Sequence, residues 1–545
     1  MKVKDHGIPF AEMSFAEKAE AYVQRQFLNR RNFLHGAAML AGAAALPAFG
    51  GSVFAQQPGG HLIVGRASGS DSLDNQKSSS ISSSEVQRHI YDTLVMLDAN
   101  TGKVNPSLAD SWTFEDENKT VVFKLRQGVK FHDGTPFNAA AVEATVKRHL
   151  DKATASPTTF LLGPIDHVEA LDDMTVAYHY KQPFVAIWAA LTLVYAAPHS
   201  PEAVAKYGAD FGRNPVGTGP YRFVSWDSND VITLERNPDR NWETPLYQNS
   251  GAPYLDSVEY RTIPEPATRV AALLSQEIDI LAGSGDAVPA DSIDQLSNTP
   301  GVSILSQTAL GATCLIPCQA VAPMDHVKVR QALGYAIDRE KMVAFALNGR
   351  GKVATSPLGS AIFNYDPATA DTSPKLDPEK AKSLLAEAGV GEGLELSYLG
   401  PDEASARIIA ESLQADLAAV GIKLRIDSLP TAEYASLRGK DKYHLIYNNY
   451  SYADADILRQ MLGMNSPLNY SRHKNQEFDD LATAQGEEFD AEKRAEEVRK
   501  MQEIVINEAI WLPLVERQII AAAREGVTPR LSAEGTLIVP DTWKA

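Results

Sequence analysis

Hydrophobic and polar positions along the chain change repeatedly from the two-residue period of strands to the longer period of helices. Residues 121–150 show this clearly, since they begin with the alternation of a strand and end with the repeat of a helix. Between the two lies His-Asp-Gly-Thr-Pro at 132–136. This segment predicts a turn, because Gly accepts positive φ and Pro fixes φ near a turn value. Asn138 follows as a suitable cap for the helix.

The same change of period recurs in the second half of the chain. Residues 267–282 predict a helix followed by a strand, and residues 327–339 predict an amphipathic helix. Another helix is expected to begin after Asp377, with Pro378 at its first position, and to end at Gly389. Such alternation of helices and strands favours α/β lobes that contain mixed sheets.

Residues 1–55 are predicted to be an export signal rather than part of the fold. Arg30 and Arg31 precede an aromatic-Leu pair, which is a twin-arginine pattern. Residues 37–49 are rich in Ala and Gly and too short for a membrane span, which needs ~20 apolar residues. Small residues at the cleavage positions place the cut after Ala55. An ordinary secretory signal is the alternative. No Cys lies near the cut, so we expect a soluble periplasmic protein without a lipid anchor.

The composition indicates an acidic chain with enough residues for a large core. The 545 residues carry a formal net charge of −18 at pH 7, and 44% of them are hydrophobic. About 490 residues follow the predicted signal, which is enough for two or three lobes. The excess of acidic residues opposes binding to nucleic acid and to anionic lipid surfaces.

The chain contains two Cys, Cys314 and Cys318, for which both a disulfide and free thiols are open. In an extended segment their Cα atoms would lie ~13 Å apart, at about 3.3 Å per residue. A disulfide requires less than about 7 Å, so the chain would have to bend at the intervening Pro317.

Motifs of the common enzyme classes are absent from the sequence. We find no His-Glu-x-x-His, Gly-x-Ser-x-Gly or Cys-x-x-Cys pattern. The 12 His are scattered, and His132, within the predicted turn, is expected to be structural. We therefore predict a protein that is not an enzyme, with no catalytic residue, no metal site and no cofactor. Carboxylates brought together by folding remain a weak alternative.

Several motifs follow one another in a fixed order and spacing. They are Leu-Ala-Asp-Ser-Trp at 108–112, Phe-Lys-Leu-Arg at 123–126 and Phe-His-Asp-Gly-Thr-Pro-Phe at 131–137. Val-Gly-Thr-Gly-Pro-Tyr follows at 216–221, and Tyr-Ala-Ile-Asp-Arg at 335–339. Together they resemble the signature of the family 5 extracytoplasmic solute-binding proteins, the receptors of peptide, nickel and opine ABC importers. The resemblance covers nearly the whole chain after the predicted signal.

The resemblance implies an α/β fold of the periplasmic-binding-protein type, with two lobes, mixed sheets and a hinge between the lobes. It also implies an extra subdomain inserted in the first lobe. On this basis we expect first-lobe residues at 56–106, the inserted subdomain at 107–214, further first-lobe residues at 215–308, the second lobe at 309–513 and a C-terminal return to the first lobe at 514–545.

The function implied is that of the periplasmic substrate-binding component of an ABC importer. Such a protein captures a solute between its lobes and delivers it to permease subunits in the inner membrane. A di- or oligopeptide is the first expectation, and an opine, a glycoside or another polar solute is the alternative. An extracytoplasmic hydrolase on a similar frame is the alternative of another class. We expect a monomer that binds no nucleic acid.

Two segments are predicted to contact the ligand. One is the Ser-rich stretch between the first strand and the first helix, since loops that follow strands often line sites. The other is a run of amides and aromatic side chains in the second lobe, although a polar strand end packed on its neighbours is an alternative there. The predicted residues are Ser68, Gly69, Asp71, Ser80 and Ser82 from the first lobe, and Asn449, Tyr450, Tyr452 and Asp454 from the second.

In the peptide-binding relatives an Asp of the second lobe pairs with the α-ammonium group of the peptide. Here Asp-Ala-Asp at 454–456 resembles the turn that follows this Asp. Tyr450 or Ser451 stands near the position that the Asp itself would occupy. This departure puts a free α-amino group in doubt and favours a neutral polar ligand, unless Asp454 holds a cationic group from a shifted loop.

Overall fold

The computed structural model describes residues 59–98, 101–242, 244, 247–249, 251–284, 286–391 and 393–545. The predicted signal residues Arg30, Arg31 and Ala55, together with the predicted cleavage position, lie outside these ranges. None of the helices in the described ranges has the length and apolar character needed to cross a membrane.

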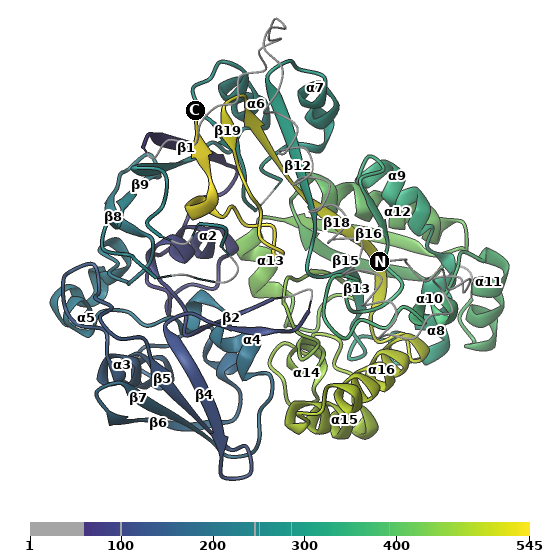
Figure 1. The fold of residues 1–545 in the computed structure, drawn as a ribbon. Coiled ribbons are helices and arrows are strands. Elements are labelled where there is room, and N and C mark those ends of the chain that lie inside the picture. The colour runs from purple at the N-terminus through teal and green to yellow at the C-terminus, as the bar shows by residue number, and fades with distance from the viewer. Residues whose placement is uncertain are drawn as a thin grey trace, which may run out of the picture. The chain divides into compact units, whose positions relative to one another are not determined.

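A large mixed sheet organises the fold (Figure 1). Its order is β16-β15-β17-β13-β18-β11-β1-β10-β9-β8, and β12 and β14 pair with β18 beside this path. We call the part around β1 the first lobe and the part around β15 the second lobe. The first-lobe strands are β1 (His61–Arg66), β8 (Tyr221–Trp226), β9 (Val231–Arg236), β10 (Ser257–Thr262), β11 (Ile280–Leu281) and β12 (Val302–Thr308). Those of the second lobe are β13 (Thr313–Pro317), β14 (Gly351–Val353), β15 (Glu395–Pro401), β16 (Lys423–Leu429) and β17 (Leu445–Asn449).

Strand β18 (Leu512–Arg524) belongs to both lobes. Its first residues pair antiparallel with β13 and β14, and its last residues pair antiparallel with β11 and β12. Figure 1 shows it as the long yellow strand that runs from one lobe into the other. The second connection is the short step from β12 to β13. The lobe boundaries that we placed at 308/309 and 513/514 stay a prediction.

Helices pack on the sheet in each lobe. The first lobe has α2 (Ile81–Ile90), α6 (Pro266–Leu274) and α7 (Ile293–Ser297). The second lobe has α8 (Val327–Ala336), α9 (Arg339–Ala346), α10 (Thr369–Thr372), α11 (Pro378–Glu387), α12 (Ala404–Ala418), α13 (Thr431–Leu437), α14 (Ile457–Leu462), α15 (Gln476–Glu487) and α16 (Ala491–Asn507). The expected α/β lobes with mixed sheets are confirmed, because β1 is parallel to β10 whereas β10 is antiparallel to β9.

A separate four-stranded antiparallel sheet of order β4-β5-β7-β6 forms the core of the inserted part. Its strands are β4 (Ala109–Glu115), β5 (Thr120–Leu125), β6 (Ile165–Asp172) and β7 (Thr175–Tyr180). Helix α3 (Ala139–Leu150) packs on β6 and β7, while α4 (Ile187–Leu191) and α5 (Pro201–Tyr207) follow in the chain. Two small hairpin-like pairs complete the fold, β2 (Val95–Leu97) with β3 (Val104–Pro106), and β19 (Val527–Thr528) with β20 (Trp543–Lys544).

The predicted turn at 132–136 anchors this subdomain to the first lobe. Asn138 caps α3, since its side-chain oxygen accepts a hydrogen bond from the Ala141 amide at 3.0 Å. His132 donates from its backbone to Gly217 and from Nε2 to the carbonyl of Gly219 at 3.0 Å. Burial lowers the pKa of His132 to about 4, so the ring is neutral. These contacts give His132 a structural role, as expected from the sequence.

The glycines of the 216–221 motif are required by a close approach of two backbones. A Cβ on Gly217 would lie 2.1 Å from the carbonyl oxygen of Ile90, and one on Gly219 would lie 2.5 Å from the Ile90 carbonyl carbon. Any side chain at these positions would therefore push this segment away from the end of α2.

Cys314 and Cys318 are both buried and free, so of the two alternatives the structure has the free thiols. Cys314 lies in β13, whose extended backbone separates the two residues. Burial raises the pKa of both thiols. Protonated, buried thiols behave as small apolar side chains.

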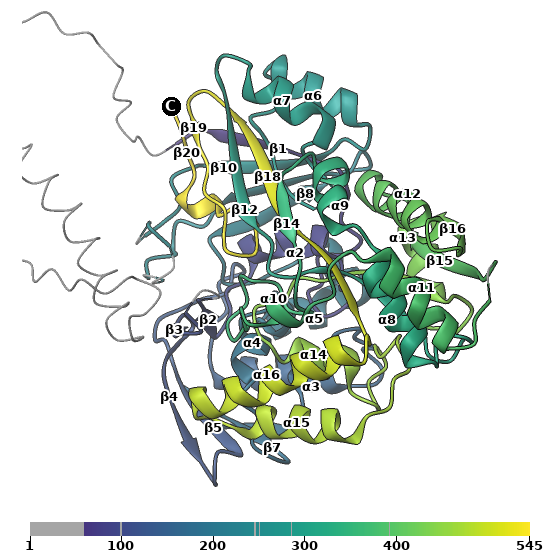
Figure 2. The ribbon, with the colours of Figure 1, turned by 90° about the vertical axis from the view of Figure 1, so that its right-hand side faces the viewer.

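Contacts join the subdomain to the second lobe. The rings of Phe114 on β4 and Phe489 after α15 meet edge to face at 4.8 Å between centroids. The Val185 amide donates to the carbonyl of Gly486 at 2.7 Å. Figure 2 shows α15 and α16 alongside the four-stranded sheet. The subdomain and the second lobe are therefore in contact on this side.

Candidate functional site

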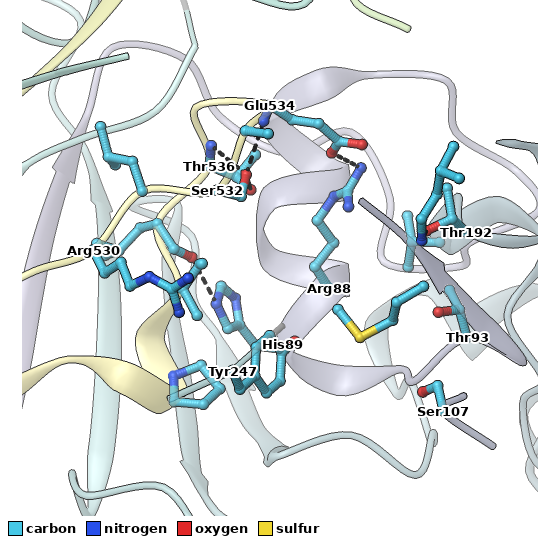
Figure 3. Close-up of a pocket in the computed structure, with 18 of the residues that line it drawn as sticks. Arg88, His89, Thr93, Ser107, Thr192, Tyr247, Arg530, Ser532, Glu534 and Thr536 are labelled. Carbon is cyan, nitrogen blue, oxygen red and sulfur yellow. Dashed lines mark hydrogen bonds and ion pairs between the residues drawn. The ribbon is translucent and has the colours of Figure 1, made fainter. Parts of the chain in front are cut away.

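A cavity of about 320 Å³ lies between α2, the strand β2 and the C-terminal segment 530–540 (Figure 3). Its walls mix apolar side chains with many polar groups, a combination typical of small-molecule sites. The volume falls at the lower end of the ~300–1,000 Å³ that such sites span. The polar and charged side chains around it are Arg88, His89, Tyr91, Asp92, Thr93, Asp98, Ser107, Thr192, Tyr247, Gln307, Arg530, Ser532, Glu534 and Thr536.

The C-terminal wall of the cavity is a short hairpin. Leu531 and Leu537 pair as an isolated antiparallel bridge, and the backbone of Ser532 donates to the carbonyl of Thr536 at 2.8 Å. The Ser532 side chain accepts from the amides of Glu534 and Thr536. These bonds hold the turn that presents Glu534 to the cavity.

Two guanidinium groups stand at the cavity, from different elements. Arg88, in the last turn of α2, pairs with Glu534 of the hairpin, and Arg530 pairs with the buried Asp541. Figure 3 shows Arg88 and Glu534 pointing toward one another, with Arg530 on the other side of His89. Each guanidinium is partly exposed but already has a carboxylate partner, so an anionic ligand would have to share Arg88 with Glu534 and Arg530 with Asp541.

His89 fixes the wall between these two arginines. Its Nε2 lies 3.1 Å from the carbonyl oxygen of Leu537, which can only accept, so Nε2 carries the proton. Nδ1 then accepts from the hydroxyl of Tyr260 at 2.9 Å. Burial lowers the pKa of His89 to about 4, so the ring is neutral near pH 7. One imidazole thus joins α2, β10 and the C-terminal hairpin without adding charge.

Asp92 forms a buried network at the base of the cavity. Arg240 donates to one carboxylate oxygen at 3.3 Å, and the Thr218 hydroxyl donates to the other at 3.2 Å. Burial raises the pKa of Asp92, and the nearby charge of Arg240 opposes that rise. These partners tie the 216–221 motif to the cavity.

The first-lobe residues predicted to bind ligand bond mainly to neighbours within the same Ser-rich segment. One carboxylate oxygen of Asp71 accepts from the hydroxyls of Ser78 at 2.5 Å and Ser83 at 2.6 Å. Ser80 and Ser82 share a hydrogen bond at 2.9 Å, and the Ser82 carbonyl accepts from Arg66. A Cβ on Gly69 would lie 1.9 Å from a carboxylate oxygen of Asp230. Ser68 is exposed.

The second-lobe residues differ in exposure. Asn449 is exposed at the end of β17, whereas Tyr450 and Tyr452 are buried. The Tyr450 hydroxyl donates to the carbonyl of Pro357 at 2.5 Å, and its ring lies 5.9 Å from that of Trp511. The Tyr452 hydroxyl accepts from the Gln460 amide at 2.9 Å.

Asp454 is paired inside the second lobe. Its two oxygens accept from the guanidinium of Arg494 at 2.9 and 2.5 Å. Burial alone would raise the pKa of Asp454, but the charge and the hydrogen bonds of Arg494 outweigh burial and hold the pKa below its usual range. Nothing in the sequence pattern pointed to this pair, because Arg494 lies on α16, 40 positions further on.

None of the nine predicted ligand residues lines the cavity, although the two regions touch. Leu97 and Ala533 of the cavity wall pack against Leu310 and against Ala453, which lies in the predicted second-lobe segment. Within the described residues, no hydrogen bond or ion pair joins the predicted first-lobe set to the second-lobe set. Ligand contact by these residues stays a prediction. The hairpin at 530–540 was missed, since the sequence placed it only in the C-terminal return.

Comparisons with known proteins give the chain a family. The model of the bacterial extracellular solute-binding proteins, family 5 middle region, matches residues 103–471. The glutathione-binding protein GsiB of Escherichia coli K12 is 29% identical over 497 residues, which cover 88% of this chain and 92% of GsiB.

Solved structures show the same fold. The periplasmic binding protein DppA of Helicobacter pylori, in complex with the peptide STSA, has a TM-score of 0.78 at 24% identity and covers 90% of this chain and 99% of its own. The binding protein AgaA of A. tumefaciens, in complex with agropinic acid, has a TM-score of 0.76 at 26% identity and covers 89% and 99%. The predicted two-lobed α/β fold is thereby confirmed. Because the family model spans more than half of the chain, this protein belongs to the family 5 bacterial extracellular solute-binding proteins.

Proposed function

We propose that this protein captures a small peptide or a peptide-like acid outside the cytoplasm and delivers it to the permease of an ABC importer. The observation that carries the proposal is the cavity, where a ligand carboxylate would share Arg88 with Glu534 and Arg530 with Asp541. Glutathione and the peptide STSA, named for two of the relatives, carry carboxylate groups, and so does agropinic acid. A guanidinium binds such groups through two parallel hydrogen bonds.

Closure of the lobes would complete the site. Leu97 and Ala533 lie in the cavity wall and pack on Leu310 and Ala453. A ligand that contacts these walls binds the closed form more tightly than the open form, and that difference shifts the population. The permease would then recognise the closed, loaded protein. Export through a twin-arginine signal to the periplasm, without a lipid anchor, is part of this proposal.

Native mass spectrometry of protein purified without denaturation first shows whether a ligand is retained. Titration calorimetry with glutathione, the dipeptide Met-Leu and agropinic acid then tests the ligand class. Whichever of these three compounds the wild type binds, Arg88→Gln should lower the affinity for it at least tenfold. Arg407→Gln is the matched control, because that exposed Arg pairs only with Asp402 in the second lobe. Equal affinity of Arg88→Gln and wild type would place the ligand elsewhere. Chemical change of the ligand on incubation would instead favour the hydrolase alternative.

The pairing of Asp454 favours one ligand subclass as a second candidate. Because its carboxylate already binds Arg494, it offers no free charge to an α-ammonium group. A solute without a free α-amino group, such as an opine, fits this arrangement. Comparing Met-Leu with N-acetyl-Met-Leu separates the two cases. Binding of the free peptide at least tenfold more tightly than the acetylated one would contradict this second candidate.

A further inference from the structure

Three side chains with metal-binding donors gather on the outer face of the four-stranded sheet. His167 and Glu169 lie on the edge strand β6, and His179 lies on its neighbour β7. His167 is paired with His179 across the two strands. Since side chains of a strand share a face every second residue, Glu169 points to the same side as His167. One donor atom from each residue lies within 4.8 Å of the other two.

The two imidazoles are already arranged side by side. Their ring centroids are 4.4 Å apart and their planes differ by 11°. The Nε2 of His179 lies 3.9 Å from a carboxylate oxygen of Glu169. This Nε2 is buried and has no hydrogen-bond partner. A buried polar atom left without a partner is uncommon and costs free energy, so a ligand for it would stabilise the fold.

Each imidazole is oriented through its other nitrogen. Nδ1 of His179 bonds to the hydroxyl of Thr120 on β5 at 3.1 Å. Nδ1 of His167 lies 2.8 Å from a carboxylate oxygen of Asp166, which can only accept, so this nitrogen carries the proton. The lone pair of His167 is thereby left on Nε2. Hydrogen bonds of this kind to the second nitrogen orient metal-binding histidines in known sites.

We propose that His167, Glu169 and His179 bind a divalent transition-metal ion of the Zn²⁺ class. Two imidazoles and one carboxylate suit Zn²⁺, Ni²⁺ and Cu²⁺, whereas Mg²⁺ and Ca²⁺ select oxygen donors. In a tetrahedral Zn²⁺ site the donors stand ~3.3 Å apart, so each must move by about 1 Å. His167 and Glu169 are exposed and can turn without disturbing the core.

This site is separate from the cavity and gives the inserted sheet a role of its own. No cavity residue belongs to β6 or β7. The three protein donors leave at least one coordination position to water or to a group from outside. The edge position of β6 makes that position reachable from solvent.

Zn²⁺ titration of the full, tag-free chain by calorimetry, with a competing chelator, tests the proposal. We expect one Zn²⁺ per chain, binding of Ni²⁺ and Cu²⁺ as well, and none of Mg²⁺. The affinity for Zn²⁺ should fall at least tenfold in each of the variants His167→Gln, Glu169→Gln and His179→Gln. His326→Gln, at an exposed His distant in sequence and in another lobe, is the matched control and should change nothing.

Three results would overturn the proposal. They are no Zn²⁺ binding by wild type, equal binding by the His167→Gln variant, or equal affinity for Mg²⁺. His179 is half-buried against Thr120, so His179→Gln can fail to fold. In that case His167→Gln decides the question, because His167 is exposed. Solute binding in the calorimetric panel should be the same in all three variants, so the metal site and the proposed transport function fail or succeed independently.

Discussion

Replacing Asp454 with Asn tests whether this carboxylate serves the fold or the ligand. Asp454 is 7% exposed and Arg494 is 6% exposed, and two hydrogen bonds of 2.9 and 2.5 Å join them. Removing the charge leaves the buried guanidinium of Arg494 without its carboxylate partner, although Gln485 still accepts hydrogen bonds from it. Breaking a buried ion pair from one side costs about 3–5 kcal/mol. The Asn oxygen still accepts one N–H bond, so we expect a loss near 3 kcal/mol, a large share of the ~5–15 kcal/mol of a folded protein.

Guanidinium unfolding, followed by circular dichroism and by tryptophan fluorescence, measures the loss. The two probes must coincide for a free energy to be defined. Asp402→Asn is the control, because Asp402 and Arg407 form a pair of similar chemistry that is about half exposed, and such pairs contribute ~0–1 kcal/mol. Ligand affinity of the Asp454→Asn protein should stay within twofold of wild type, provided the measurement is made well below its unfolding midpoint.

Acid adds a second readout to the same variant. The folded-state pKa of Asp454 is depressed, so its contribution is fully present above the unfolded value of about 3.9 and is lost as pH falls through the folded pKa. Wild type should therefore lose its advantage over Asp454→Asn at the acid end. An Asp454→Asn protein as stable as wild type that no longer binds any member of the panel would refute the reasoning and return Asp454 to the ligand.

Three further outcomes are expected. Tyr450→Phe should lower the free energy of unfolding by about 1 kcal/mol in guanidinium melts, since it leaves the buried carbonyl of Pro357 without that donor; no loss would show that the bond is not formed. Burial lowers the pKa of His89 to about 4, so the folded state resists protonation of this ring. The melting temperature should therefore fall as pH drops from about 6.5 toward 4, and it should fall less in His89→Phe. The same dependence of melting temperature on pH in both proteins would contradict this. Arg30→Lys with Arg31→Lys should stop export, and unimpaired export in a strain without the twin-arginine pore would refute the predicted signal.

Local patterns predicted the parts of the fold that depend on neighbouring residues. The cap at Asn138 follows from one side chain and an amide three residues away, and Asp377 accepts from the Lys380 amide in the same way. Gly389 ends α11 with a φ of +71°, as its position predicted. These features need no knowledge of the tertiary structure, because every interacting atom lies within one helical turn.

The candidate sites depend on partners that are distant in sequence. The hairpin that carries Glu534 meets Arg88 across more than 400 positions, and no periodicity in the chain indicates that meeting. His167 and His179 looked scattered in sequence, although the β6–β7 pairing brings them together. The prediction that the Tyr and Asp residues at 450–454 contact the ligand rested on composition. Composition cannot distinguish a ligand-binding wall from a buried strand end whose polar atoms already have partners.

The double membership of β18 has a consequence for how the chain reaches its fold. β18 follows every other strand of the large sheet in the chain, and each lobe needs it to complete that sheet. During synthesis both β11 and β13 therefore keep an unpaired edge until β18 has been made. A chain that ends before Leu512 would lose the centre of both lobes rather than a tail. One strand thus completes both lobes, and a chain without β18 should aggregate as a whole.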